Sequence, residues 1–120
     1  MKILKIILLL VPLYTVTSCV KNEMPVKVDY TKTTIKFSTQ ILPIFQTNCT
    51  SCHSPGGQSP DLTTANAYNQ LKLKNLYDTK NPSNSTIYKM INTGGAMNQY
   101  WGSTSPSMML TWITQGALNN

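Results

Sequence analysis

The sequence contains no arginine, one histidine, three cysteines and four acidic residues among its 120 positions. All ten basic residues are therefore lysines, and the formal charge is +6 at pH 7. The lysines form no stripe or tract, so the excess charge indicates a solvated, mildly basic surface rather than a nucleic-acid-binding protein. Internal repeats and strand-like alternation are also absent. Hydrophobic residues make up 41% of the chain, which is typical of a globular protein, and this length favours one domain.

The N-terminal apolar run is too short to cross a membrane as a helix, which requires about 20 apolar residues. It covers residues 6–13, is interrupted by Pro12 and follows Lys2 and Lys5. A short positive segment before a short apolar one is typical of an export signal, and the length argues against an uncleaved membrane anchor.

The end of this segment, Val16-Thr17-Ser18-Cys19, resembles a bacterial lipobox. The resemblance implies that residues 1–18 are a lipoprotein signal peptide and that Cys19 is acylated as the first mature residue. Loss of Lys2 and Lys5 would lower the formal charge from +6 to +4. We expect residues 19–33 to form a tether and residues 34–120 a folded domain. The protein would then be exported and lipid-anchored to a bacterial membrane, facing the periplasm or the cell surface.

The other two cysteines lie close together, in Cys49-Thr50-Ser51-Cys52-His53. C-x-x-C-H is the pattern of covalent c-type haem attachment. Two intervening residues let both thiols reach the two vinyl groups on one porphyrin edge, and the following histidine lies under the ring as an iron ligand. His53 is the only histidine, so it has no rival for this role. We therefore expect one haem c per chain, held by Cys49, Cys52 and His53.

A zinc site and a thioredoxin-like redox pair are the alternatives for this motif. Structural zinc sites use four ligands, and the only other thiol, Cys19, falls in the export signal. A redox pair would accompany a βαβ pattern, which the sequence lacks. The cysteine count also favours haem, because lipid on Cys19 and thioethers on Cys49 and Cys52 leave no thiol over.

The hydrophobic pattern predicts an all-α domain of three to four helices joined by loops. A first helix from Phe37 leads into the cysteine motif, with Ser38 as its cap and Pro43 in its first turn. Two further helices are expected through residues 67–71 and 87–91, capped respectively by Thr63 or Thr64 and by Ser85. The last helix is predicted over residues 106–115, with Ser105 as N-cap, Pro106 at the first position and Gly116 at its end.

With this helix, cysteine pair and histidine, the chain from Thr34 to Asn120 resembles class I cytochrome c domains. Within that class it is similar to the short mono-haem lipoprotein cytochromes of the Bacteroidetes type. The resemblance implies a small cytochrome c-like fold in which the N-terminal helix crosses the C-terminal helix around one covalent haem. Residues 112–117 also resemble an ending that is common in these domains.

The resemblance implies further haem contacts. Pro60-Asp61-Leu62 matches a proline–x–leucine segment of the family, so the Pro60 carbonyl would accept a hydrogen bond from His53 and Leu62 would pack on the haem. Met97, in a glycine-containing loop, stands where the family carries the sixth iron ligand, although Asn98 replaces the proline that usually follows. Met108 and Met109 are the alternative ligands, but their place in the last helix favours a core position.

A helical chain of this size with long loops has few apolar residues to bury, so we expect it to fold poorly without haem. Aromatic residues against the ring would supply much of the buried area. The expected packing partners of the haem are Phe37, Phe45, Leu62, Tyr68, Ile91 and Trp112.

Iron held by histidine and methionine is saturated, so the sequence predicts a one-electron carrier and not an enzyme. A peroxidase would need an open distal position and an acid–base residue, and the only histidine is already used. The alternative is a haem-based sensor or binding module for a small ligand, with a weak or vacant sixth position. We expect a monomer with transient redox protein partners, membrane contact through lipid on Cys19, and no nucleic acid.

Overall fold

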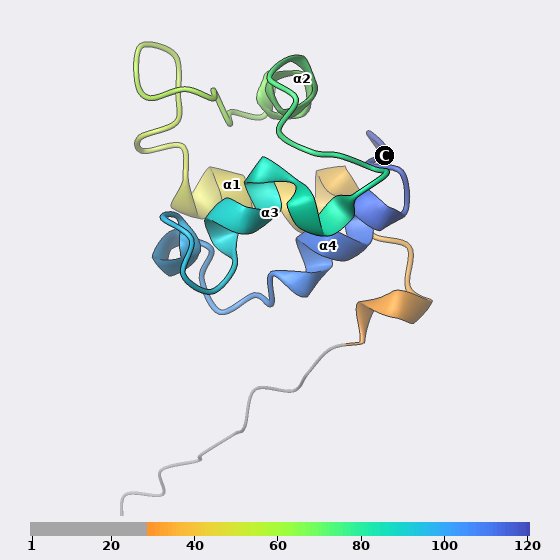
Figure 1. Ribbon diagram of the computed structural model, residues 1–120. Coiled ribbons are helices and arrows are strands. Elements are labelled where there is room, and N and C mark those ends of the chain that lie inside the picture. Colours follow the sequence, from red (N-terminus) through yellow and green to blue (C-terminus); the bar gives the residue numbers. More distant parts are fainter. Residues whose placement is uncertain (1–28) are drawn as a thin grey trace, which may run out of the picture.

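The computed structural model describes residues 29–120, which contain helices and no strand. The expected signal peptide, residues 1–18, and Cys19 lie outside the described residues. Figure 1 shows the four α-helices of the domain, which are α1 (Leu42–Asn48), α2 (Ala67–Leu73), α3 (Thr86–Ile91) and α4 (Ser107–Thr114). Short helical turns precede or join them: η1 (Tyr30–Lys32), η2 (Phe37–Ile41), η3 (Pro82–Asn84) and η4 (Asn98–Tyr100). The all-α prediction is confirmed, and no helix in residues 29–120 has the length and apolarity of a membrane span.

The predicted first helix consists of η2, a π-helical turn, followed directly by α1. Pro43 lies in the first turn of α1, as predicted, at the junction where the π-helical turn η2 continues into α1. The predicted Ser38 cap is wrong, because Asn120 caps this end instead. Its side-chain oxygen accepts from the Phe37 N–H and its backbone carbonyl accepts from the Ser38 N–H, each at 2.9 Å. A residue 82 positions away in sequence therefore satisfies the orphan donors of the helix start.

The predicted cap of α2 is wrong and that of α3 is right in position only, because neither helix has a side-chain capping hydrogen bond. No side chain caps α2, and the Thr63 hydroxyl donates to the Asp61 carboxylate at 2.7 Å. Ser85 does occupy the cap position of α3, but its hydroxyl accepts from the Asp78 N–H at 2.8 Å. Both hydroxyl groups make hydrogen bonds within loops instead of capping the start of a helix.

The predicted ends of α4 agree with the structure to within one residue. The Ser105 hydroxyl accepts from the Ser107 N–H at 3.3 Å, which is the pattern of an N-terminal cap. Pro106 stands just before the first helical residue rather than at it. Gly116 ends the helix with φ +99°, a backbone conformation that favours glycine.

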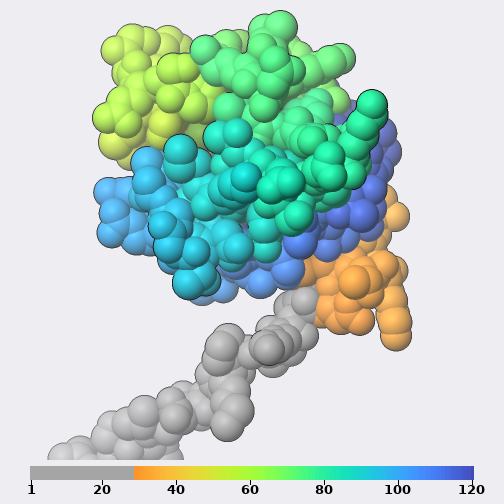
Figure 2. Space-filling model, viewed as in Figure 1, coloured from red at the N-terminus to blue at the C-terminus, as the bar shows by residue number. Residues whose placement is uncertain are grey.

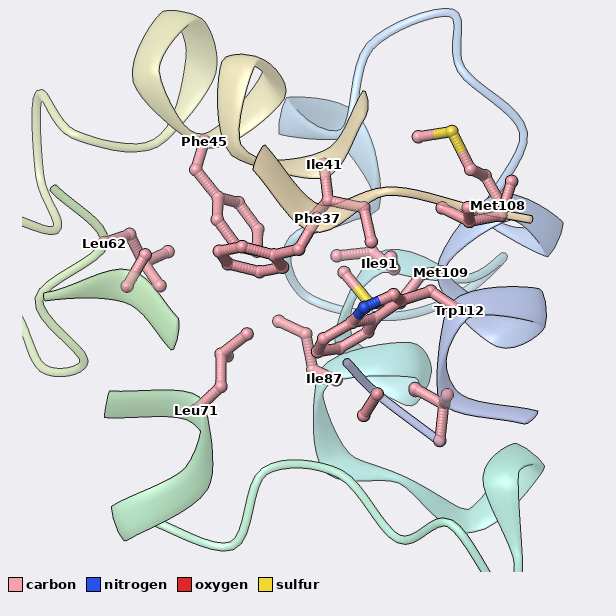
Figure 3. Close-up of a cluster of buried hydrophobic side chains, with 14 of the residues drawn as sticks. Phe37, Ile41, Phe45, Leu62, Leu71, Ile87, Ile91, Met108, Met109 and Trp112 are labelled. Atoms are coloured by element: carbon pink, nitrogen blue, oxygen red, sulfur yellow. The ribbon is translucent and has the colours of Figure 1, made fainter. Parts of the chain in front are cut away.

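The core lies where η2, α2, α3 and α4 meet, and Figure 3 shows its larger side chains. Phe37 of η2 packs against Trp112 of α4, with ring centroids 5.3 Å apart, so the N-terminal helical segment contacts the C-terminal helix. Tyr30, in the last part of the expected tether, also packs against this core. The buried hydrophobic residues are Ile35, Phe37, Ile41, Phe45, Leu62, Ala67, Leu71, Ile87, Ile91, Trp101, Met108, Met109, Trp112, Ile113 and Ala117.

Candidate functional site

A largely apolar cavity of about 580 Å³ lies at the end of the domain where the two longest loops meet. This volume is within the range of about 300–1,000 Å³ that is typical of ligand and cofactor sites. Figure 2 shows the loop after α1 and the loop after α3, coloured yellow-green and blue, at the same end of the molecule. The wall contains Phe45, Asn48, Cys49, Ser51, Cys52, His53, Gln58, Ser59, Pro60, Leu62, Leu76, Thr86, Ile87, Met90, Ile91, Ala96, Met97, Gln99, Tyr100 and Trp101.

The structure brings all six predicted haem-binding residues to this one cavity, namely Cys49, Cys52, His53, Pro60, Leu62 and Met97. Cys19, the predicted lipidation site, lies outside the described residues. The six come from three separate parts of the chain, which are the end of α1, the loop after it and the loop after α3.

The cysteine motif continues directly from α1 as a tight turn. Cys49 is the C-cap of α1, and its carbonyl accepts from the Cys52 N–H at 3.1 Å and from the His53 N–H at 2.8 Å. These hydrogen bonds fold the five residues back on themselves. The turn therefore places Cys49, Cys52 and His53 on the wall of the same cavity.

One hydrogen bond orients the His53 side chain and identifies which ring nitrogen is its donor. Its Nδ1 lies 3.1 Å from the Pro60 carbonyl oxygen. Because a carbonyl only accepts, Nδ1 carries the proton and Nε2 keeps its lone pair. This tautomer leaves Nε2 as a donor atom for a metal, and a carbonyl partner of this kind is typical of metal-binding histidines.

The segment that supplies the Pro60 carbonyl is held on both sides. The Leu62 N–H donates to the His53 carbonyl at 2.9 Å, and the Gln46 side-chain amide donates to the Leu62 carbonyl at 3.1 Å. Asp61 accepts from both the hydroxyl and the N–H of Thr63, and these hydrogen bonds hold the pKa of the Asp61 carboxyl below its ordinary value. The Pro60 carbonyl is therefore preorganised toward His53.

Two methionines line the cavity, and the sequence pointed to only one of them. Met97 is half-buried and packs against the core, whereas Met90 of α3 is 42% exposed. Met108 and Met109 are buried in the core and do not line the cavity, as the helix pattern predicted. Met90 was expected only as part of the helix through residues 87–91, because helix periodicity does not show which side of a short helix faces a cavity.

The aromatic wall of the cavity differs from the prediction. Phe45, Leu62 and Ile91 line it as expected, but Phe37, Tyr68 and Trp112 do not. These last three pack on one another away from the cavity, with the Phe37 and Tyr68 ring centroids 5.4 Å apart. They lie away from the cavity because η2, which carries Phe37, packs against α4, which carries Trp112.

Trp101 is the aromatic residue that sequence reasoning missed. It lies in a loop of small and polar residues, which gave no periodic signal of burial, yet it is only 2% exposed. Its ring stands against Phe45 at the cavity, with centroids 6.1 Å apart. The indole Nε1–H of Trp101 is buried and has no hydrogen-bond partner within residues 29–120. A buried donor without a partner is costly, so this group is suited to an acceptor on a bound molecule.

The alternatives for the cysteine motif gain no support. Within residues 29–120 no three side chains of histidine, cysteine, aspartate or glutamate are grouped as metal ligands. Burial raises the pKa of the Cys49 thiol, whereas the reactive cysteine of a redox pair needs a lowered pKa.

A family model described as Cytochrome c matches residues 43–115. This match includes the cysteine motif, both partners of the His53–Pro60 hydrogen bond, the Met97 loop and all of α4. No curated protein and no solved structure matches the chain.

Proposed function

Because the chain belongs to the cytochrome c family, which binds covalent haem c and transfers electrons, we propose that it is a one-electron carrier with histidine–methionine ligation. The observation that carries this proposal is the convergence of Cys49, Cys52, His53 and Met97 on one cavity. The two thiols would hold the haem as thioethers, and His53 Nε2 and Met97 Sδ would be the donors to its iron.

The residues of the cavity fit this group in size and in chemistry. The wall is mostly apolar, and the His53 tautomer presents a free lone pair to a metal. The buried Nε1–H of Trp101 would donate to a haem carboxylate, which supplies the acceptor that the chain itself lacks. Charge-assisted hydrogen bonds of this kind are roughly twice as strong as neutral ones.

When bound, the haem supplies a one-electron iron couple, and a thioether ligand raises its potential. The chain's own groups fix the donor atoms and limit access. Met97 in the sixth position would exclude small ligands, and among the described residues no carboxylate lines the cavity to serve as the acid–base residue that a peroxidase needs. These features support a carrier over a catalyst.

Carbon monoxide tests the proposed ligation, because it binds ferrous haem only where the sixth position is open. We expect the wild-type protein to bind carbon monoxide only slowly and Met97→Ala to bind it readily, with a lower reduction potential. Met90→Ala is the matched control, since Met90 lines the same cavity and should leave both readouts unchanged. Ready binding by the wild type would favour the small-ligand sensor, and an effect confined to Met90→Ala would reassign the ligand.

We further propose that lipid on Cys19 anchors the protein to a bacterial membrane, where it meets its redox partners as a monomer in transient contacts. The support is the lipobox-like segment that ends at Cys19. The wild-type protein should fractionate with membranes and carry acyl chains by mass spectrometry, whereas Cys19→Ala should lack them. A wild-type protein that is wholly soluble and carries no lipid would contradict this localisation.

A further inference from the structure

The loop that carries Met97 is tied to the end of α3 by the side chain of its neighbour. Helix ends leave their last carbonyl groups without partners inside the helix. At the end of α3, the Met90 carbonyl accepts from the Met97 N–H at 2.8 Å. The next carbonyl, that of Ile91, accepts from the side-chain amide of Asn98 at 2.8 Å. Met97 and its neighbour Asn98 are therefore hydrogen-bonded to consecutive carbonyls at the end of α3.

Gly95 permits this close approach of the loop to the helix. A Cβ atom at this position would collide with the carbonyl oxygens of Lys89 and Met90. The loop backbone therefore lies directly against the end of α3. The same helix contributes Ile87 and Ile91 to the cavity wall. Movement of the Met97 backbone away from the cavity would break its own hydrogen bond to Met90, the one from Asn98 to Ile91, or both.

We propose that Asn98 is a positioning residue, whose side-chain amide holds Met97 at the cavity by fastening the loop to the Ile91 carbonyl. This inference rests on the proposed ligation by Met97. The hydrogen bond is partly buried and bridges seven residues, so it fixes the loop rather than a local turn. Because the Ile91 oxygen only accepts, an amide satisfies it and an ionised carboxylate does not.

The test compares Asn98→Leu and Asn98→Asp with wild type in the haem-loaded protein. Both changes remove the donor. Leucine is similar in size to asparagine, and aspartate is similar in shape. Loss of one hydrogen bond should raise the open population of the loop about three- to tenfold. Amide hydrogen exchange of Met97 and the rate of carbon monoxide binding to the ferrous protein should rise by that factor. The reduction potential should fall, and the sulfur–iron charge-transfer band of the ferric protein should lose intensity.

Asn92→Leu is the matched control, since Asn92 lies in the same loop and its side chain makes no hydrogen bond within the described residues. It should leave all four readouts at their wild-type values. Exchange and carbon monoxide rates within twofold of wild type, with an unchanged potential, in both Asn98 variants would overturn the inference. An equal effect in Asn92→Leu would also overturn it. A wild-type protein without the charge-transfer band would refute the ligation by Met97, while Met97 amide exchange would still decide whether Asn98 holds the loop.

Discussion

The two ends of this domain are held together in different ways. At one end Phe37, Tyr68, Tyr77 and Trp112 pack ring against ring, and their contacts join η2, α2 and α4 into a filled core. Figure 3 shows Phe37 and Trp112 of this group. At the other end, two loops surround a cavity of about 580 Å³ and are fixed mainly by hydrogen bonds to backbone carbonyls.

The difference shows which part of the fold depends on the cofactor. Side chains of the chain itself fill the aromatic end, so its packing needs no other molecule. The apolar wall of the cavity end has no such partners from the chain, and a haem plate would supply them. Changes at the cavity end should therefore alter spectrum and stability together, whereas changes at the aromatic end should alter stability alone.

Removing both thiol attachments should have the largest effect. Cys49→Ala with Cys52→Ala leaves the haem extractable and deprives the cavity end of its packing partner. Most of the folding free energy, which is about 5–15 kcal/mol for a domain of this size, should be lost. Circular dichroism during thermal unfolding would show a weak, broad transition. A sharp transition at the wild-type temperature would mean that the cavity end is stable by itself.

Truncation at the aromatic end comes next in size. Trp112 is fully buried, and its Nε1–H donates to the Leu118 carbonyl at 2.9 Å. Trp112→Ala should lower the free energy of unfolding by about 3–5 kcal/mol while the haem spectrum and potential stay unchanged. Leu73→Ala, at a side chain that is 75% exposed, should change stability by less than about 0.5 kcal/mol. A large spectral shift in Trp112→Ala would remove the proposed separation between the two ends.

Sequence reasoning worked where periodicity or a local motif carries the information. The order of the helices, the turn at Pro43 and the end of α4 at Gly116 followed from helix patterns and glycine and proline chemistry. The cysteine motif needed only five neighbouring residues. The first and last helical segments were also expected to meet, and they do so through Phe37 and Trp112.

Contacts between distant residues were the part that the sequence did not reveal. Asn120 caps η2 from the far end of the chain, and the Ser38 hydroxyl that looked like a cap is not used. Trp101 has no periodic neighbours to signal that it is buried. Asn98 looked like the loss of a proline, but its side chain provides a tie to Ile91 that no local pattern encodes.

Trp101→Phe tests the cavity end without emptying it. If the indole N–H donates to a haem carboxylate, the haem-loaded variant should lose about 1.5–3 kcal/mol of unfolding free energy. If the donor has no partner in the loaded protein, the same change should be neutral or stabilising, because it removes a buried unsatisfied group. Guanidinium unfolding of the loaded proteins therefore decides the matter by the sign of the change.

The smallest effect is expected at Tyr77, within the aromatic end. Burial, together with the neighbouring Tyr68, raises the pKa of Tyr77 from 10.0 to about 12. The folded state thus favours the neutral phenol, so its stabilisation is complete below pH 10 and is lost as the pH rises toward 12. Tyr77→Phe should show a shallower fall in stability over that interval, measured by urea unfolding at each pH. Identical slopes in the two proteins would contradict this assignment.

The attachment of haem to the cysteine motif is tested most directly by mass spectrometry of a tryptic digest after denaturation and acid–acetone extraction. No lysine or arginine lies between Lys36 and Lys72, so residues 37–72 form one peptide that contains Cys49 and Cys52. That peptide should carry the added mass of one haem. An unmodified peptide, with haem in the acetone phase or with zinc in the protein, would contradict the account.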